Sequence, residues 1–461
     1  GQPLGPRRLS QQPVPKPPKL DAFLSDAALR VKKQARGCLA PELCMQAVRA
    51  ATERPFAAGV QKEQELFRVL VTSGQAQALQ YAFFAERAVR RWTTASGASW
   101  QSASPQPIRK AGVVGLGTMG RGIVACLVKA NIPVVAVEQD VRSLAAGSKA
   151  VLLLLEREAT KQKQGAPALD FQNPARLRFT LDLAALSEVD VVIEAVFEDM
   201  ALKKEIFRKL SGVCKPDAFL CTNTSALSID AIASATSRPQ QVVGTHFFSP
   251  AHVMRLLEVV YGHHTSPAAV ATAVQLAKAL DKVGVVVGNC FGFVGNRMMF
   301  PYVEQAVFLV EEGSRPEAVD EVLEEFGLKL GPFRMSDLAG LDVGWRSRKG
   351  QGLPGVAVPA GAASRQRHGR RYSPLPDLLC ENGRFGQKTG KGWYQYEKAG
   401  GRTARPDPWL HDFLCRYRDT QGIQSRPIDR EEILERCLFS LINQGFDILA
   451  EGVASGPEHL D

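Results

Sequence analysis

The sequence predicts an α/β domain with a doubly wound, mainly parallel sheet, preceded by a helical linker region and followed by an all-helical region in two related copies. Between residues 111 and 245, short apolar segments alternate with segments of helical period, the pattern of a parallel sheet covered by helices. A glycine-rich turn joins the first strand to the first helix, and beyond Cys290 the strand pattern stops. We expect a leader 1–19, a linker region 20–108, a sheet domain 109–288, a first helical copy 289–395 and a truncated second copy 396–461.

Composition and charge narrow the class of protein. With 461 residues and 45% hydrophobic content, the chain is long enough for several globular domains. Its net charge of +10 suits an anionic partner, and because no nucleic-acid motif accompanies the basic residues, we favour a phosphate-bearing small molecule over DNA or RNA. The nine cysteines show neither a Cys-x-x-Cys pair nor zinc-ligand spacing, and no apolar run approaches the ~20 residues of a membrane span. We predict no metal site and no membrane span.

The front of the chain precedes the sheet domain. Residues 1–19 are rich in proline and predict a flexible leader. Helical periodicity follows, with Pro41 opening one helix and Gly74 interrupting a long helical run over 61–92. The Ser, Gly and Pro residues of 97–107 predict a linker.

The sheet domain is predicted element by element from the apolar segments. We expect strands over 111–114, 134–137, 189–195, 218–222 and 241–245, with helices over 119–129 and 202–210.

The first turn of this domain has the pattern of a dinucleotide-binding loop. Gly115-Leu116-Gly117-Thr118-Met119-Gly120 follows an apolar strand and precedes a helix. Gly115 permits the tight turn, Gly117 lets backbone amides approach a pyrophosphate, and Gly120 allows close packing of the helix on the sheet. The alternative is a glycine-rich turn without a ligand. The position between strand and helix favours a Rossmann domain.

An acidic residue ends the next strand. Glu138 follows 134–137 at the distance where a carboxylate accepts the ribose hydroxyls of a dinucleotide. Because a carboxylate repels a 2'-phosphate, we predict NAD rather than NADP. We expect Thr118 and Met119 to line the cofactor with the three glycines. A solvated charge at a strand end remains the alternative for Glu138.

One histidine and one glutamate form the predicted acid/base pair. His246 follows an apolar strand, where the carboxyl end of a doubly wound sheet opens on the ligand crevice. Glu258 lies in the next apolar strand and needs a partner there. A carboxylate bonded to one imidazole nitrogen would fix the tautomer and stabilise the imidazolium of a general base. A core histidine with a backbone partner is the alternative.

Two neutral donors complete the predicted catalytic set. Ser225 and Asn296 suit a substrate hydroxyl and a carbonyl oxygen, where charge shifts during reaction. Either residue could instead cap a helix.

Beyond the sheet, two helical stretches resemble each other. Their matching residues at identical spacing are Arg297, Phe300, Gln305, Glu312 and Gly313 in the first, and Arg436, Phe439, Gln444, Glu451 and Gly452 in the second. With a two-residue shift, Pro316, Glu317 and Asp320 match Pro457, Glu458 and Asp461. Helices use similar residue types, so a few matches are expected by chance, but the extent of this match favours a duplication.

Three segments together resemble the 3-hydroxyacyl-CoA dehydrogenase family: Cys221-Thr222-Asn223-Thr224-Ser225, Gly244-Thr245-His246-Phe247-Phe248-Ser249-Pro250 and Gly292-Phe293-Val294-Gly295-Asn296-Arg297. The resemblance covers about residue 110 to the C-terminus. It implies NAD-dependent oxidation of L-3-hydroxyacyl-CoA thioesters in fatty-acid β-oxidation, with His246 and Glu258 as the catalytic dyad and Ser225 and Asn296 as substrate contacts.

The resemblance also implies further cofactor contacts: Ala195, Val196, Glu198, Lys203 and Asn223. For Glu198 and Lys203, a solvated charge remains the alternative. Many single-function relatives have Asn in the place of Ser249, so a role for that position in orienting His246 does not carry over. The basic candidates for the CoA end are Lys161, Lys163, Arg346, Arg348 and Lys349, each with a solvated surface charge as the alternative.

Residues 20–92 resemble the linker of bifunctional family members, in which an enoyl-CoA hydratase domain with isomerase activity precedes the dehydrogenase. No hydratase catalytic pattern precedes residue 20, and Leu460-Asp461 is not a peroxisomal signal, so a peroxisomal location is implied by the resemblance alone. Because the helical domain dimerises in single-function relatives and a second copy would replace that contact, we expect a monomer. Two other functions stay open: a dehydrogenase of free hydroxy acids, and an inactive NAD-binding or scaffold fragment.

Overall fold

The structure is a computed structural model of the chain. It describes Ser10, Val14 and residues 19–35, 37–89, 103–160, 169–350, 366–367 and 370–461. The predicted leader 1–19, apart from Ser10, Val14 and Lys19, lies outside the described residues, as does the first part of the linker 97–107. Within the described ranges, no helix is both long and apolar enough to cross a membrane.

An eight-stranded sheet organises residues 111–288, in the order β3-β2-β1-β4-β5-β6-β7-β8. Neighbouring strands are parallel except β6 and β7, which are antiparallel. This confirms the predicted doubly wound, mainly parallel sheet. The strands are β1 Ala111–Val114, β2 Val134–Val137, β3 Leu177–Thr180, β4 Val191–Glu194, β5 Phe219–Thr222, β6 Val242–Phe247, β7 Leu256–Tyr261 and β8 Val283–Gly288.

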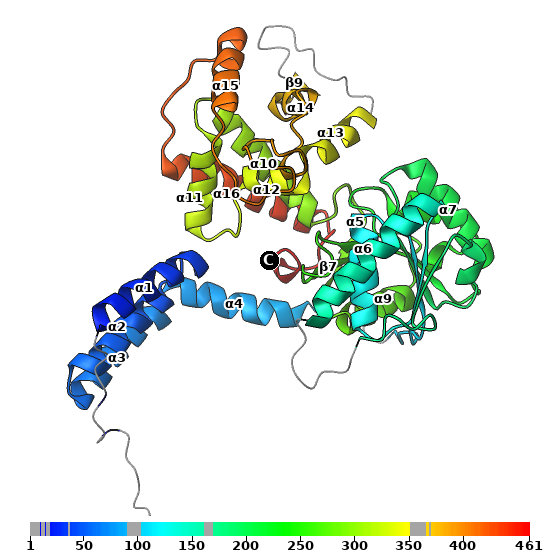
Figure 1. Cartoon of the computed structure of the whole chain (residues 1–461), viewed down its shortest axis with the longest axis horizontal. Coiled ribbons are helices and arrows are strands. Elements are labelled where there is room, and N and C mark those ends of the chain that lie inside the picture. The colour runs from blue at the N-terminus through cyan, green and yellow to red at the C-terminus, as the bar shows by residue number, and fades with distance from the viewer. Residues whose placement is uncertain are drawn as a thin grey trace, which may run out of the picture. The chain divides into compact units, whose positions relative to one another are not determined.

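Helices cover both faces of the sheet because nearly every strand residue is apolar and buried. One core lies under α5 (Thr118–Lys129), α6 (Val141–Thr160) and α9 (Pro267–Ala279), with α5 and α6 side by side (Figure 1). The opposite core lies under α7 (Met200–Val213) and α8 (Ile229–Ala233), where Ile448 and Ala454 from the end of the chain also pack.

The remaining helices precede or follow the sheet strands along the chain. They are α1 Leu20–Gln34, α2 Ala40–Glu53, α3 Phe56–Val71, α4 Gly74–Ala88, α10 Gly295–Glu311, α11 Pro316–Phe326, α12 Pro332–Ala339, α13 Leu341–Gly350, α14 Leu375–Glu381, α15 Pro408–Gln421 and α16 Arg430–Ala450. Pro41 lies in the first turn of α2, and the long run predicted over 61–92 is divided between α3 and α4 just before Gly74. Both features agree with the sequence.

The described chain forms two compact units. The sheet unit comprises Phe84–Phe300 and Leu441–Asp461, and the helical unit comprises Gly1–Phe83 and Pro301–Ser440. The helices α10 and α16 each contribute to both units. The predicted domain boundaries stay a prediction, because these units group distant segments of the chain.

The two helical stretches with matching sequences pair through their equivalent residues. In the sheet unit, Arg297 at the start of α10 donates to both oxygens of Glu451 at 2.6 and 2.7 Å. In the helical unit, Arg436 donates to both oxygens of Glu312 at 2.7 and 3.0 Å. Each arginine of one stretch thus binds the matching glutamate of the other, which supports the proposed duplication.

Two of the buried aspartates of the helical unit, Asp320 and Asp337, each accept three hydrogen bonds. Asp320 is fully buried and accepts from two amides at the start of α12 and from the Tyr394 hydroxyl at 2.7 Å. Asp337 accepts from the amides of Trp393 and Tyr394 and from the Tyr396 hydroxyl at 2.9 Å. These bonds tie α11, α12 and the strand-like segment around Trp393 into one core.

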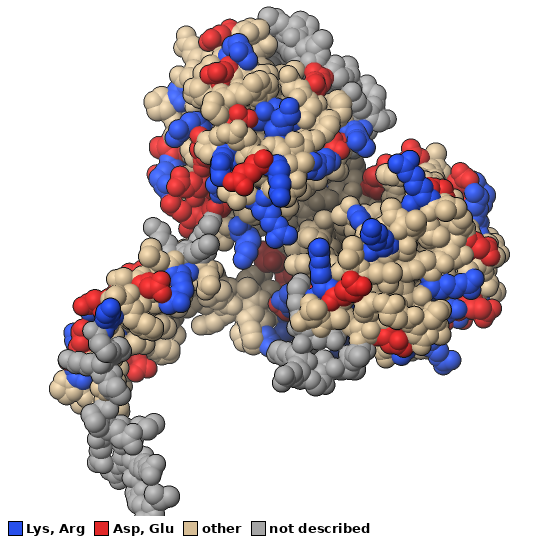
Figure 2. Space-filling model, viewed as in Figure 1, with Lys and Arg blue, Asp and Glu red and all other residues tan. Residues whose placement is uncertain are grey.

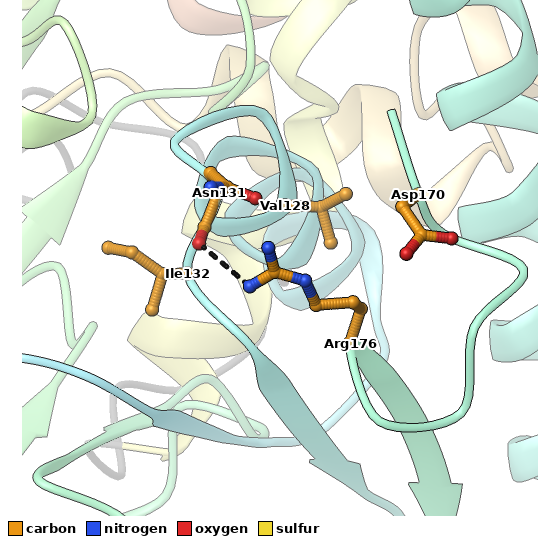
Figure 3. Close-up of a pocket in the computed structure, with 5 residues that line it drawn as sticks. All are labelled: Val128, Asn131, Ile132, Asp170 and Arg176. Atoms are coloured by element: carbon orange, nitrogen blue, oxygen red, sulfur yellow. Dashed lines mark hydrogen bonds between the residues drawn. The ribbon is translucent and has the colours of Figure 1, made fainter. Parts of the chain in front are cut away.

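On the face shown in Figure 2, Lys and Arg side chains and Asp and Glu side chains are both spread over the described surface. A small pocket lies at the amino end of β2 and β3, lined by Val128, Asn131, Ile132, Asp170 and Arg176 (Figure 3). Its volume of ≈ 10 Å³ leaves room for about one water molecule. The chemistry-bearing residues lie at the opposite, carboxyl ends of the strands.

Candidate active site

The predicted site residues gather at the carboxyl ends of the parallel strands within the sheet unit. The strand order reverses direction between β1 and β4, and such a switch point opens a crevice for ligands. The loop after β1 carries the glycine motif, and the loops after β4 and β5 carry 195–198 and 223–226. The strands thus bring together segments that are far apart in sequence.

The glycine loop has the geometry that a dinucleotide requires. Gly115 has φ +95, and a Cβ there would lie 2.8 Å from the carbonyl oxygen of Ala195. A Cβ on Gly120 would lie 1.8 Å from the carbonyl oxygen of Gly115, so the first turn of α5 packs directly on the loop. A Cβ on Gly117 would meet nothing within 4 Å, and no side chain caps α5 there. The N-terminus of α5 thus has no side-chain cap and has open space at Gly117, as binding of a pyrophosphate requires.

The acid at the end of β2 is half-buried and directed toward this loop. Glu138 accepts from the amide of Leu116 at 2.6 Å and from that of Gln139 at 3.0 Å. The carboxylate therefore has a fixed position beside the glycine motif, which does not agree with a freely solvated strand-end charge. Its remaining lone pairs suit ribose hydroxyls.

His246 and Glu258 form a buried pair, as the sequence predicts. They lie directly opposite each other on the antiparallel strands β6 and β7, so both side chains leave the same face. The Nδ1 atom of His246 lies 2.6 Å from Oε2 of Glu258. The pair is shielded from water, since His246 is 5% exposed and Glu258 is 2% exposed. The rings of Phe248 and Phe293 pack beside the imidazole at centroid distances of 4.4 and 5.7 Å.

The second oxygen of Glu258 is held by the start of α10. Oε1 accepts from the amides of Val294 and Gly295 at 3.1 and 2.8 Å. A helix N-terminus favours a negative charge, so the carboxylate is stabilised as an anion beside the imidazole. With Nδ1 bound to Glu258, Nε2 is the ring nitrogen left to exchange a proton with a substrate.

Ser225 and Asn296 lie next to each other, and neither caps a helix. The Asn296 side-chain amide donates to the Ser225 carbonyl at 3.2 Å. Ser228, not Ser225, caps α8, and Asn296 lies inside the first turn of α10. The capping alternatives are therefore wrong. The Ser225 hydroxyl donates to Glu198 at 3.0 Å.

Glu198 and Lys203 belong to a chain of ionic contacts that begins at the buried Glu194 and ends at the more exposed Glu198. Lys203 is fully buried, and its Nζ lies 2.7 Å from Glu194 and 3.5 Å from Glu198. Glu194 also accepts from Thr222 at 2.7 Å. The solvated alternative for Lys203 is wrong, because the ammonium faces two carboxylates. A contact of Lys203 with the cofactor stays a proposal, acting through Glu198.

Glu198 remains ionised in this setting. Burial alone would raise its pKa, but the Lys203 ammonium and hydrogen bonds from Thr224 and Ser225 outweigh burial and lower the pKa below its ordinary value. One oxygen, Oε1, accepts from Thr224 at 2.6 Å and from the Ser225 amide at 2.8 Å. The anion therefore organises the loop after β5.

The other predicted positions are placed as follows. The Asn223 side chain accepts from the Phe247 amide at 2.9 Å and so joins the end of β5 to β6 beside His246. The Ser249–Pro250 peptide is cis. Arg346 is exposed and lies 3.4 Å from Asp342.

Four further residues were candidates for binding CoA. Lys161 and Lys163 lie outside the described residues, and the side chains of Arg348 and Lys349 are likewise not described. Among the described residues, no group of three or more His, Cys, Asp and Glu side chains could hold a metal ion.

The sequence did not reveal Glu194 or the amides that hold Glu258. Glu194 ends an apolar strand as Glu138 does, and that signal was available. Its partner Lys203 lies on a helix, and hydrophobic periodicity gives no distance between a strand end and a helix. The amides of Val294 and Gly295 carry no side-chain signal at all.

Two family models match the chain. Residues 110–290 match the model described as 3-hydroxyacyl-CoA dehydrogenase, NAD binding domain, and residues 292–396 match the model described as 3-hydroxyacyl-CoA dehydrogenase, C-terminal domain. The first matched region contains the sheet, the glycine loop and the His246–Glu258 pair, and the second begins at the turn that holds Glu258.

Curated relatives and solved structures are similar over most of the chain. A human protein named peroxisomal bifunctional enzyme is 59% identical over 460 residues, which is 100% of this chain and 63% of that protein. The crystal structure of the dehydrogenase part of multifunctional enzyme 1 from C. elegans has a TM-score of 0.58 at 29% identity, covering 82% of this chain and 83% of that one. (S)-3-hydroxybutyryl-CoA dehydrogenase from Ralstonia eutropha has a TM-score of 0.55 at 30% identity, covering 63% of this chain and 100% of that one.

Proposed function

The chain belongs to the 3-hydroxyacyl-CoA dehydrogenase family, and on that premise we propose that it oxidises (S)-3-hydroxyacyl-CoA to 3-ketoacyl-CoA with NAD. The observation that carries the proposal is the buried His246–Glu258 pair at 2.6 Å. Bound NAD supplies the acceptor for the hydride that leaves C3. The glycine loop and Glu138 are the residues that would hold it, since a Cβ at Gly117 would meet nothing within 4 Å and the uncapped N-terminus of α5 suits a pyrophosphate.

His246 is the general base in this proposal. Its Nε2 takes the proton of the substrate hydroxyl as the C3–H bond breaks, so that the alcohol becomes a ketone. The imidazolium that forms is stabilised by Glu258, which is itself held as an anion by two amides of α10. The near-complete burial of both residues strengthens this charge compensation.

Ser225 and Asn296 are the proposed substrate contacts. Their proximity at the loop after β5 brings together two neutral polar groups: the Ser225 hydroxyl oxygen, which can still accept, and the Asn296 amide, which keeps one free N–H. Glu198 fixes the Ser225 hydroxyl, and Asn296 fixes the loop through the Ser225 carbonyl. The cofactor contacts proposed at Ala195, Val196 and Asn223 lie on the neighbouring loops after β4 and β5.

A peroxisomal role in fatty-acid β-oxidation is part of the same proposal. It rests on the similarity to the human protein named peroxisomal bifunctional enzyme. Because the chain spans 63% of that relative, the accompanying hydratase and isomerase activities stay a prediction. A monomer is also proposed, supported by the pairing of the two matching helical stretches within one chain.

The substitution His246→Gln tests the proposed function. We expect it to lower acetoacetyl-CoA reduction by NADH at least ~100-fold, the scale of a lost general acid/base, while NADH binding stays close to that of the wild type. Steady-state kinetics and fluorescence titration of NADH measure the two effects. Near-normal turnover of the variant would overturn the assignment of His246.

A comparison of substrates separates the alternatives. If acetoacetate is reduced at a rate equal to that of acetoacetyl-CoA, the chain is a dehydrogenase of free hydroxy acids. If the wild-type chain binds NADH but reduces neither compound, it is an inactive NAD-binding or scaffold protein. The proposed function predicts reduction of the thioester alone.

A further inference from the structure

Residues just beyond α16 hold both ends of the turn that carries the Glu258-binding amides. On one side, the guanidinium of Arg297 donates to Glu451 through both terminal nitrogens, at 2.6 and 2.7 Å. On the other side, the amide of Gly288 at the end of β8 donates to the carbonyl of Val453 at 2.7 Å. The turn 289–295 lies between these two anchors, all within the sheet unit.

This turn has a demanding backbone conformation. Gly292 and Phe293 both have positive φ, +74 and +49, and a left-handed conformation is uncommon for a bulky aromatic residue. Phe293 is fully buried beside the imidazole of His246. Two such residues in succession persist only where surrounding contacts hold them.

The turn sets the position of three groups in the site. It ends on Val294 and Gly295, whose amides bind Glu258, and it is followed directly by Asn296, whose side chain binds the loop of Ser225. Loosening the turn would therefore move the carboxylate, the imidazole bound to it and the Asn296 amide together.

We propose that Glu451 is a positioning residue for the dehydrogenase reaction. By binding both terminal nitrogens of Arg297, it fixes the first turn of α10, and through that turn the amides on Glu258 and the side chain of Asn296. This gives the second helical stretch a part in catalysis at a site that it does not line. The inference rests on the proposed function.

The Arg297–Glu451 pair itself contributes little to stability. The Glu451 side chain is 53% exposed and that of Arg297 is 18% exposed, and ion pairs open to solvent are screened and weak. A planar, bidentate arginine–carboxylate contact nevertheless fixes geometry well. Loss of Glu451 should therefore affect turnover more than melting temperature.

The matching pair at the other end of α10 provides the control. Arg436 binds both oxygens of Glu312, and Glu312 also receives Arg426 at 2.7 Å. This pair has the same chemistry, but both of its residues belong to the helical unit, whereas the turn 289–295 belongs to the sheet unit. Because Glu312 is half-buried among several arginines, its loss should lower stability more than the loss of Glu451 does.

The experiment compares Glu451→Ala with Glu312→Ala in the full chain. We expect Glu451→Ala to lower kcat for acetoacetyl-CoA about tenfold, because sub-ångström displacement of catalytic groups is costly, with the KM for NADH within about twofold of the wild type. Glu312→Ala should lower the melting temperature more and leave kcat within about twofold. The double variant Arg297→Glu with Glu451→Arg exchanges the two charges. Its kcat should be at least about threefold higher than that of the single variant Glu451→Arg.

Hydrogen exchange gives a readout that does not depend on activity. Glu451→Ala should speed amide exchange in 292–296, and Glu312→Ala should not. Unchanged kcat and unchanged exchange in Glu451→Ala would overturn the inference, as would an equal loss of kcat in Glu312→Ala. If the wild type reduces no acetoacetyl-CoA, the proposed function fails, and the exchange rates still decide whether Glu451 holds the turn.

Discussion

Two buried carboxylates, one in each unit, are held by the same device, but only one lies in the candidate active site. Glu258 accepts from two amides at the start of α10, and Asp320 accepts from two amides at the start of α12. Each has one further partner: His246 at 2.6 Å for Glu258, and the Tyr394 hydroxyl at 2.7 Å for Asp320. The amide cradle is common to both, so the difference in chemistry lies in that last partner.

The comparison shows which feature marks a catalytic carboxylate. An imidazole exchanges protons near neutrality, whereas a phenol does so near pH 10, and burial raises the pKa of Tyr394 still further. Burial also raises the pKa of Asp320 to about 6, against the amide and tyrosine bonds that lower it, although Asp320 has no role in the proposed mechanism. A raised pKa therefore identifies a buried acid here, and the geometry of its partner identifies its role.

The largest expected effect comes from neutralising the carboxylate that contacts histidine. Glu258→Gln keeps the size of the side chain but removes the charge that stabilises the imidazolium, so we expect kcat for acetoacetyl-CoA to fall about 100-fold. The KM for NADH should change little, because Glu258 touches none of the glycine loop. Steady-state kinetics at fixed pH measures both constants.

The same chemical change at the structural carboxylate is the control. Asp320→Asn leaves one amide donor or the Tyr394 hydroxyl without an acceptor, and we expect a loss of about 2 kcal/mol in the free energy of unfolding. Its kcat at a temperature where it is folded should match that of the wild type. A hundredfold loss of kcat in Asp320→Asn would show that the comparison misassigns the two roles.

The next effect is a dependence of stability on pH in the helical unit. Burial raises the pKa of both Asp320 and Asp337 to about 6 in the folded chain, from 3.8. Between about pH 4 and 6, the unfolded carboxyls are ionised while the folded ones retain protons, so the folded state binds more protons and the free energy of unfolding falls as pH rises. A shift of about two pKa units corresponds to roughly 3 kcal/mol for each group at most.

Urea unfolding followed by the fluorescence of the five tryptophans, among them Trp393 beside Asp337, tests this dependence. The useful window lies between about pH 4.5 and 6. Bonds from Arg436, Arg371 and Arg426 lower the pKa of Glu312 to about 2 despite its burial, so the stability that Glu312 contributes is lost only below about pH 4.5. Asp337→Asn should flatten the slope. A slope unchanged in that variant would contradict the assigned pKa.

The sequence predicted the parts of the site that depend on strand order. His246 and Glu258 lie on consecutive apolar strands, and their pairing follows once those strands are neighbours, as the structure confirms. The glycine motif and Glu138 were likewise predictable, because the strand, turn and helix are contiguous in sequence. Patterns within one stretch of chain carry that information.

Contacts between distant helices could not be predicted in the same way. The matching spacing aligned Glu451 with Glu312, but it gave no sign that each glutamate binds the arginine of the other stretch. Lys203 was predicted as a cofactor contact, and its burial between Glu194 and Glu198 depends on how α7 packs on β4. Helical period states which face is buried, but not which residue lies opposite.

The smallest effect is expected from removing the last partner of Asp320. Tyr394→Phe keeps the buried ring and deletes one hydroxyl donor, so it should cost about 1 kcal/mol of unfolding free energy, the typical net contribution of one hydrogen bond. Because that bond lowers the pKa of Asp320, its loss should move the pH dependence of stability to higher pH. Tyr396→Phe, which removes the equivalent donor from Asp337, is the matched variant. A loss of kcat in Tyr394→Phe as large as that expected for His246→Gln would contradict this comparison. The hydrogen-bond partner of a buried carboxylate would then not decide whether that carboxylate is catalytic, and the surroundings of Glu258 and Asp320 would have to explain the difference.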